Sequence, residues 1–148
     1  MNIFLKFILF FLINVTFMSA QEWQTDFELA KKAAEQKKLP IVLVFQGSDW
    51  CAPCIKLDKE IWSSDAFISY AKDHYIMLKA DFPRRKKNKL PEQQTQANAQ
   101  LAERYKSNGV FPLVVVLRPN GEVLGKTSYK KLTPKSYIEL LNSIVERY

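Results

Sequence analysis

The sequence contains few of the residues that hold metal ions in proteins. Of its 148 residues, two are cysteine and one, His74, is histidine. A structural zinc ion takes four ligands, so these three residues cannot complete a site built from cysteine and histidine. Only four glycines are present, and none belongs to a phosphate-binding loop or a nucleophile elbow. We therefore expect neither a metal ion nor an organic cofactor.

Glycine and proline are also too scarce to form a flexible linker or a fibrous repeat. The seven prolines and four glycines are scattered along the chain, and the sequence has no internal repeat. With 47% hydrophobic and 13% aromatic residues the chain can bury a core, which argues against intrinsic disorder. A length of 148 residues suits one compact domain.

Acidic residues are outnumbered, because 22 lysines and arginines face 15 acidic residues and give a formal net charge of +7. Five of the cations fall in the run 84–89, which begins at Arg84 and ends at Lys89. This run lies in a segment, 82–94, that contains two prolines and is predicted to be an exposed loop. Such a run is usually a solvated, mobile segment, and polyanion binding is the less common alternative. No nucleic-acid partner is predicted.

The first twenty residues have the layout of a secretory signal. Lys6 supplies a positive charge, an apolar run follows over 7–13, and the small residues Ser19 and Ala20 stand at the expected cleavage point. We therefore predict a signal peptide over 1–20, a mature domain over 21–148, and export to the periplasm or out of the cell. Because Met18 is bulkier than the residue expected three positions before cleavage, an uncleaved membrane anchor is the alternative.

Apolar patterns predict that helices and strands alternate along the mature chain. A continuous apolar run predicts a strand over 41–45, and further strands are predicted over 75–81 and within 110–117, the last with a hairpin partner over 122–124. Helical spacing predicts a helix capped by Thr25, one that begins near Cys51 and buries Ile55, and three more over 64–70, 95–105 and from Thr133 onward. The predicted fold class is α/β, with a mixed central sheet flanked by helices.

Cys51 and Cys54 come directly after the strand predicted over 41–45, at the start of a helix. The partial positive charge of a helix N-terminus stabilises a thiolate, which is the reactive form of cysteine. We therefore expect Cys51 to attack a substrate disulfide and Cys54, one turn deeper and more shielded, to resolve the mixed disulfide. A disulfide that closes so short a loop adds little stability. This favours redox chemistry over the alternative of an inert structural disulfide.

The stretch 47–54, with the sequence Gly-Ser-Asp-Trp-Cys-Ala-Pro-Cys, resembles the active-site motif of the thioredoxin family. The order of predicted elements agrees with that family over about residues 24–146, and Pro112 falls where the family carries a cis-proline. The resemblance implies a three-layer thioredoxin-like sandwich and a cis bond before Pro112. It also implies a substrate-binding surface that consists of Trp50, Ala52, Phe111 and Pro112.

The sequence departs from thioredoxins where they carry a buried aspartate paired with a lysine, since Val44 and Met77 occupy these places. The stretch 49–62 is closer to exported reductase domains, such as the C-terminal thioredoxin domain of the membrane electron transporter that reduces periplasmic proteins. Those domains carry an acid four residues after the second cysteine, where this sequence has Asp58. The resemblance makes Asp58 a candidate catalytic acid–base group that takes the proton of Cys54. An ordinary solvated carboxylate is the alternative.

The residues between the two cysteines bear on the direction of exchange. They are Ala52 and Pro53, and they lack the histidine that is typical of strongly oxidising members of the family. We therefore predict a thiol–disulfide oxidoreductase that reduces disulfides in exported proteins or peptides and is recharged by a membrane thiol electron donor. A disulfide isomerase and a non-catalytic binding module on the same scaffold are the alternatives.

Overall fold

The computed structural model describes residues 20–147. The predicted signal peptide over 1–20 lies outside this range apart from Ala20, so both the signal and its cleavage remain predictions. Within residues 20–147, no helix is both long enough and apolar enough to span a lipid bilayer.

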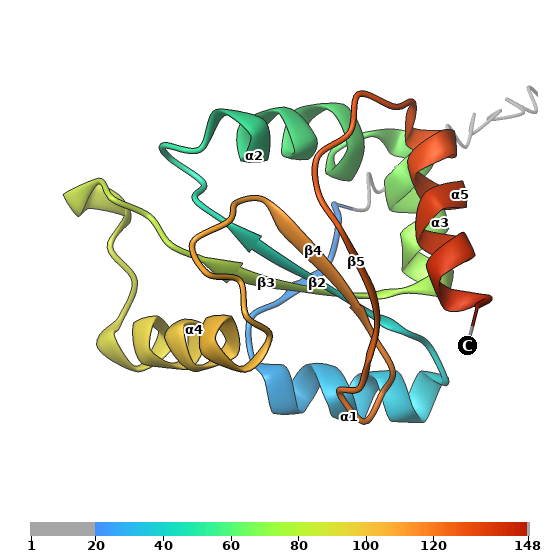
Figure 1. Ribbon diagram of the computed structural model, residues 1–148, viewed down its shortest axis with the longest axis horizontal. Coiled ribbons are helices and arrows are strands. Elements are labelled where there is room, and N and C mark those ends of the chain that lie inside the picture. The colour runs from blue at the N-terminus through green and yellow to red at the C-terminus, as the bar shows by residue number, and fades with distance from the viewer. Residues whose placement is uncertain (1–19, 148) are drawn as a thin grey trace, which may run out of the picture.

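A five-stranded mixed sheet forms the middle layer of the molecule (Figure 1), with the strand order β1-β3-β2-β4-β5. The central strand β2 (Ile41–Gln46) pairs in parallel with β3 (Ile76–Asp81) and antiparallel with β4 (Leu113–Leu117). The edge strands are β1 (Trp23–Gln24) and β5 (Val123–Thr127). The first five residues of β2 are fully buried, because both faces of the sheet are covered.

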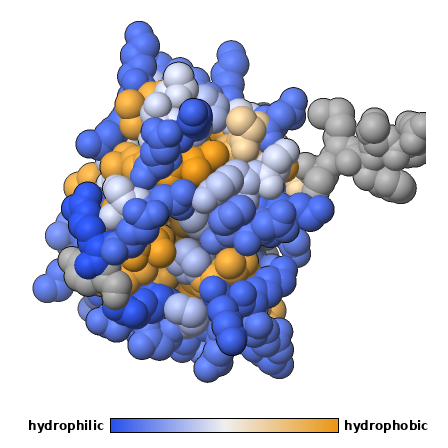
Figure 2. All heavy atoms as spheres, turned by 90° about the vertical axis from the view of Figure 1, so that its right-hand side faces the viewer, coloured by the Kyte–Doolittle hydropathy of each residue, from blue (hydrophilic) through white to orange (hydrophobic). Residues whose placement is uncertain are grey.

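Helices cover both faces of the sheet, which confirms the predicted three-layer α/β sandwich. On one face lie α1 (Phe27–Lys37) and α4 (Glu92–Arg104), which appear below the sheet in Figure 1. On the other face lie α2 (Ala52–Leu57), α3 (Asp65–His74) and α5 (Pro134–Val145). Each face has its own hydrophobic core. The outer surface on the side of α3 and α5 is mostly hydrophilic, with smaller hydrophobic areas between the charged side chains (Figure 2).

The helix that carries the cysteines continues past α2 into a π-helical turn, η1 (Asp58–Trp62). At its end Trp62 is only 1% exposed, and its ring makes edge-to-face contacts with Trp23, Phe67 and Tyr137. Aromatic side chains bury large apolar areas and gain further from such geometry. Trp62 therefore fixes the far end of the cysteine-bearing helix against the sheet.

One residue of this helix lies on a different face from the one predicted. Ile55 was expected to be buried, but it is 47% exposed, whereas Cys54 and Leu57 are buried. Residues three apart share a helix face, and each successive residue turns about 100° around the axis. Since Cys54 and Leu57 face the sheet, their neighbour Ile55 faces solvent.

Two predicted helix starts were also wrong. The N-cap of α1 is Asp26 rather than Thr25, because the Asp26 carboxylate accepts a hydrogen bond from the backbone N–H of Leu29 (2.9 Å). Helix α4 starts at Glu92, three residues earlier than predicted, with Pro91 as its N-cap. Residues 92–94 are polar and give no apolar signal, but glutamate and glutamine form helices readily. The loop after β3 is therefore shorter than expected.

A buried polar residue attaches α4 to the end of β3. Asn98 is 1% exposed, and its side-chain amide donates a hydrogen bond to the backbone carbonyl of Asp81 (2.9 Å). Its own carbonyl accepts one from Nε2 of Gln94 (2.8 Å). Buried polar groups need such partners, because an unpaired one retains its full desolvation penalty. Asn98 thus fixes the position at which β3 gives way to the following loop.

We expect Asn98→Ala to destabilise the protein by about 1–3 kcal/mol, because it leaves the partly buried Asp81 carbonyl without this partner. Urea denaturation of the disulfide form measures the change in the free energy of unfolding. The matched control is Gln96→Ala, an exposed position on the same helix, which should change it by less than about 0.5 kcal/mol. Equal effects of the two variants would contradict this role of Asn98.

Candidate active site

Cys51 and Cys54 are joined by a disulfide at the point where β2 leads through a short turn into α2. Cys51 is the N-cap of α2, and its Sγ accepts a hydrogen bond from the backbone N–H of Cys54 (3.3 Å). The Cα atoms are 5.2 Å apart, within the range of ordinary disulfides. The predicted position of the pair at a helix start is therefore confirmed.

The two cysteines are buried to nearly the same extent in this oxidised form. Cys51 is 4% exposed and Cys54 is 3% exposed. Cys54 was expected to be more shielded than Cys51, and in the disulfide state the difference in that direction is negligible. The backbone N–H of Cys51 donates a hydrogen bond to the carbonyl of Gly47 (2.9 Å), which holds the backbone of Cys51 in the turn. Only a small area of Cys51 is open to a partner.

The bond between Phe111 and Pro112 is cis, as the family resemblance implied. Pro112 is buried just before β4, and its carbonyl accepts a hydrogen bond from Oγ of Ser128 (2.6 Å). Phe111 is partly exposed and meets the ring of Trp50 edge-on, with 5.7 Å between the ring centroids. The structure thus brings together Phe111 and Trp50, although 61 positions separate them in the sequence. Ala52 is exposed in the first turn of α2.

Trp50 is held from three sides. Its indole N–H donates to the backbone carbonyl of Phe82 (2.7 Å), and the guanidinium carbon of Arg84 lies 3.6 Å from the ring centroid. The indole also lies directly on the backbone of Gly47, so that a Cβ atom at Gly47 would overlap the ring. Only glycine leaves room for Trp50 at this position.

Asp49 connects the turn before Cys51 to the segment that follows β3. Its carboxylate accepts hydrogen bonds from the backbone N–H groups of Arg84 (2.9 Å) and Arg85 (3.0 Å) and from Nδ2 of Asn88 (2.9 Å). The hydrogen bonds from Arg84 and then from Asn88 hold the pKa of Asp49 below its usual value. Desolvation opposes them, and the hydrogen bond and charge of Arg85 lower the pKa further by smaller amounts. The run 84–89 is exposed, as predicted, and hydrogen bonds from Arg84, Arg85 and Asn88 also tie it to the active-site turn.

A second carboxylate adds to this connection. Asp81, at the end of β3, accepts hydrogen bonds from the backbone N–H (2.9 Å) and the hydroxyl (2.6 Å) of Ser48. Sequence reasoning did not identify Asp49, Asp81 or Arg84 as parts of the site. The only local signal was an acidic residue beside the Trp-Cys motif, because the partners lie more than thirty residues away.

Asp58 follows Cys54 by one helical turn, and its backbone N–H donates to the carbonyl of Cys54. The residue is exposed as a whole, yet nearby protein removes part of the water around its carboxyl group. This desolvation raises the pKa of Asp58, against the opposing charge of Lys79. Val44 and Met77 are both buried in the apolar core, so the aspartate–lysine pair of thioredoxins has no equivalent at these two positions.

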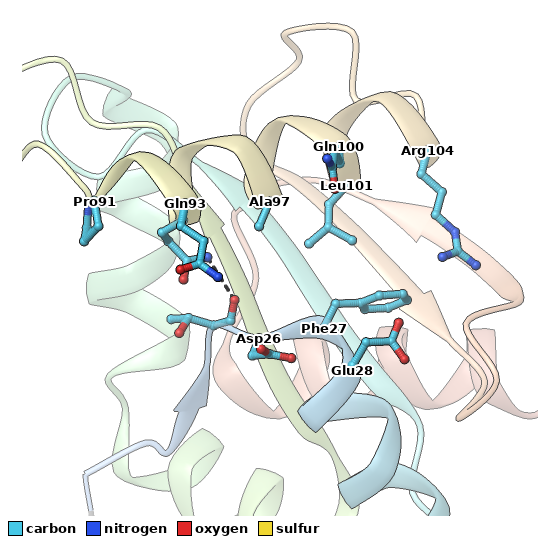
Figure 3. Close-up of a pocket in the computed structure, with 11 residues that line it drawn as sticks. Asp26, Phe27, Glu28, Pro91, Gln93, Ala97, Gln100, Leu101 and Arg104 are labelled. Atoms are coloured by element: carbon cyan, nitrogen blue, oxygen red, sulfur yellow. Dashed lines mark hydrogen bonds between the residues drawn. The ribbon is translucent and has the colours of Figure 1, made fainter.

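A hollow in the surface lies away from the cysteines. A cavity of about 590 Å³ opens between the start of α1 and helix α4 (Figure 3), with Ala97 and Leu101 facing Phe27 and with Pro91 and Arg104 at its ends. None of the residues around the cysteines lines it. Within the described part of the chain, no cluster of three or more histidine, cysteine or acidic residues could hold a metal ion.

We expect Gly47→Ala to displace the indole of Trp50 and to destabilise the protein by about 1–3 kcal/mol, the usual effect of overpacking. In a ¹H–¹⁵N spectrum, the indole resonance assigned by Trp50→Phe should shift, because its hydrogen bond to Phe82 is lost. The indole resonances of Trp23 and Trp62 provide internal controls. An unchanged Trp50 resonance in Gly47→Ala would show that the turn accommodates a side chain here.

Comparison with known proteins agrees with this geometry. A family model described as thioredoxin-like matches residues 22–119. The disulfide bond reductase DsbH of Chlamydia pneumoniae is 34% identical over 125 residues, which cover 84% of this chain and 73% of that protein. The solved structure of a DsbH oxidoreductase superimposes with a TM-score of 0.80 and 31% identity, covering 86% of each chain.

A more distant comparison supports the fold alone. The solution structure of a thioredoxin from Thermus thermophilus matches with a TM-score of 0.64 at 14% identity, covering 86% of this chain and 88% of that one. The family model spans most of the described chain, and the identity to DsbH extends over the stretch that contains the bonded cysteines. The chain therefore belongs to the thioredoxin-like family and is a thiol–disulfide oxidoreductase.

Proposed function

We propose that this protein reduces disulfide bonds in exported proteins or peptides, with Cys51 as the nucleophile and Cys54 as the resolving thiol. The observation that carries the proposal is the position of Cys51 as the N-cap of α2, where its Sγ accepts a hydrogen bond from the backbone N–H of Cys54. The same donor and the helix dipole would stabilise a thiolate on Cys51 in the reduced protein.

The exchange proceeds in two steps that conserve atoms and electrons. The Cys51 thiolate attacks one sulfur of the substrate disulfide, and the other substrate sulfur leaves as a thiolate that takes up a proton. The thiol of Cys54 then loses its proton and attacks Cys51 Sγ, which releases the second substrate thiolate. Two electrons pass from the protein dithiol to the substrate. The protein is left with the Cys51–Cys54 disulfide of the present structure.

Asp58 is the group that we assign to proton transfer from Cys54. It lies one turn beyond Cys54 on the same helical run, and desolvation raises its pKa above the usual value for aspartate. A carboxylate with a raised pKa is a stronger base than an ordinary surface aspartate. In its ionised form this carboxylate can accept the proton of Cys54. Within this proposal Asp58 takes the part that the buried aspartate plays in thioredoxins.

Substrate binding in this proposal uses the surface next to the disulfide. Trp50 and Phe111 form an aromatic pair beside Cys51, Ala52 is exposed, and Pro112 supports Phe111 through the cis bond. A polypeptide that carries a disulfide can lie against these apolar groups while its sulfur reaches the small open area of Cys51. The proposal gives these four residues a binding role and leaves the chemistry to Cys51, Cys54 and Asp58.

Reduction requires a source of electrons outside the chain. We propose that a membrane thiol electron donor reduces the Cys51–Cys54 disulfide after each turnover. We also propose that the signal pattern over 1–20 directs export of the protein. The name of the relative, disulfide bond reductase, supports the reducing direction. On this proposal the reduction potential of the pair lies near that of thioredoxin, about −270 mV, and not near the −120 mV of a strong oxidant. A titration against glutathione measures it.

The two cysteines should differ sharply when each is replaced. We expect Cys51→Ser to abolish insulin reduction and to accumulate no mixed disulfide with the substrate, because the attacking sulfur is gone. Cys54→Ser should also block turnover but accumulate a mixed disulfide with the substrate, since resolution is lost. Non-reducing gels and mass spectrometry detect the adduct. Reduction of insulin that survives both substitutions would remove the catalytic proposal in favour of a binding module.

Replacing Asp58 should slow resolution more than attack. At pH 7 we expect Asp58→Asn to lower the rate of resolution of the mixed disulfide by about tenfold or more, because a positioned base is lost. The pKa of the Cys54 thiol should fall at the same time, since a nearby negative charge is removed. Stopped-flow kinetics and thiol titration by ultraviolet absorbance measure these two quantities.

The pH profile separates this role from a structural one. In the wild type the resolution rate should rise as pH increases through the raised pKa of Asp58, because the carboxylate is the active form. In Asp58→Asn only the titration of the thiols should remain. Asp73→Asn, an exposed acid on α3, is the control and should leave the profile unchanged. Identical profiles for all three proteins would show that Asp58 is an ordinary solvated acid.

A further inference from the structure

The strongest concentration of charge in the fold lies beside the active site. Residues 84–89, here called the cationic loop, hold five cationic side chains, all of them exposed: Arg84, Arg85, Lys86, Lys87 and Lys89. The two salt bridges found among residues 20–147 lie elsewhere, at Glu28 and at Glu122. The positive charge of the cationic loop is therefore not neutralised by ion pairs with the described chain.

The loop is attached to the residues that immediately precede Cys51. Asp49 binds the backbone of Arg84 and Arg85, and Trp50 donates to the carbonyl of Phe82. A 3₁₀ turn, η2 (Lys86–Asn88), follows, and the side chain of Asn88 returns to Asp49. These bonds give the charged segment a defined position at the rim of the site.

The bonding of Asp49 leaves the cationic side chains available. Its two carboxylate oxygens are occupied by backbone N–H groups and by a neutral amide, not by a guanidinium or an ammonium group. The guanidinium of Arg84 lies over the Trp50 ring, so one positive charge is held on the neighbour of Cys51. No salt bridge is found at Arg84 within residues 20–147.

We propose that the cationic loop is a specificity surface for acidic polypeptide substrates, namely chains with aspartate or glutamate within a few residues of the disulfide to be reduced. This inference rests on the proposed function of the Cys51–Cys54 pair. An extended chain advances about 3.4 Å per residue, so side chains a few positions from the substrate cysteine come within reach of the loop. Complementary charge accelerates encounter and suppresses wrong partners.

The position of the loop favours a polypeptide over a membrane or a nucleic acid. A general polyanion surface needs cations spread over a broad face, whereas these cations follow one another in one short segment. That segment is hydrogen-bonded to Asp49, two residues before Cys51, and its Arg84 lies over Trp50. The partner that must come to this place in every turnover is the chain that carries the disulfide. The surface therefore adds charge selection to the apolar contacts of the site.

The test uses three synthetic peptides that share one intrachain disulfide and differ only in flanking residues, which are glutamate, lysine or serine. The reduced full-length protein passes two electrons to each peptide, giving the peptide dithiol and the protein disulfide. Stopped-flow fluorescence gives the second-order rate constants. We expect the glutamate peptide to react about tenfold faster than the lysine peptide at about 0.01 M salt. At about 0.5 M salt the ratio should approach one because charges are screened.

Charge variants test whether the lysines of the cationic loop cause the preference for the glutamate peptide. The variant Lys86→Gln/Lys87→Gln/Lys89→Gln retains Arg84 and Arg85 with their contacts. In it the rate constants of the glutamate and lysine peptides should differ by no more than about twofold, while the serine peptide reacts at the wild-type rate. Replacing the same three lysines by glutamate should reverse the order of the peptides. The matched control is Lys32→Gln/Lys37→Gln/Lys72→Gln. Lys37 and Lys72 line a hollow beside the first residues of β3, at the opposite end of that strand from the loop. This control should keep the wild-type preference.

Several results would overturn the inference. One is a wild type that reduces the glutamate and lysine peptides at equal rates in low salt. Another is a control triple variant that loses as much preference as the loop variant, which would make net charge the cause. A loop variant that keeps the preference but no longer binds vesicles containing phosphatidylglycerol would point to a lipid surface instead.

Failure of the proposed function would look different. If the serine peptide is not reduced but its dithiol form is oxidised by the disulfide form of the protein, the proposed direction is wrong. The rates at which the protein disulfide oxidises the glutamate and lysine dithiol peptides then test whether the cationic loop selects acidic substrates. A protein that is inert with the serine peptide in both directions refutes the proposed function, and the inference falls with it.

Discussion

The carboxylates of Asp49 and Asp81 hold two distant segments of the chain together beside the disulfide. Asp81 binds Ser48 in the turn before Cys51, and Asp49 binds the backbone at Arg84 and Arg85. Acting together these hydrogen bonds hold the turn before Cys51 against the loop that follows β3.

The second constraint on the site is hydrophobic and acts from the other end of the helix. Trp62 packs against rings from three other elements, so the helical run from Ala52 through the π turn cannot shift without exposing a large apolar surface. Full burial of a large apolar side chain contributes about 1.5–3 kcal/mol. The N-terminus of this run, where Cys51 lies, is thereby held still while the sulfurs change partners.

In the proposed mechanism, the acid–base group lies outside the apolar core. The positions where thioredoxins keep a buried aspartate and lysine hold Val44 and Met77, which pack in the apolar core. The candidate base, Asp58, lies one helical turn beyond Cys54, where nearby protein removes part of its solvent although the residue as a whole is exposed. An ionised carboxylate is costly in an apolar interior, so this arrangement spares the core a large desolvation penalty.

The sequence by itself determined the features that depend on neighbouring residues. An unbroken apolar run produced the buried strand β2, and Cys51 and Cys54 followed at a helix start because Pro53 is tolerated in a first turn. Only the tertiary structure decided that Asp49 captures the loop, that Arg84 covers Trp50, and that Cys51 is as buried as Cys54. These contacts join residues brought together by the register of β2 against β3 and by the turns that follow them. Local periodicity carries no information about such partners.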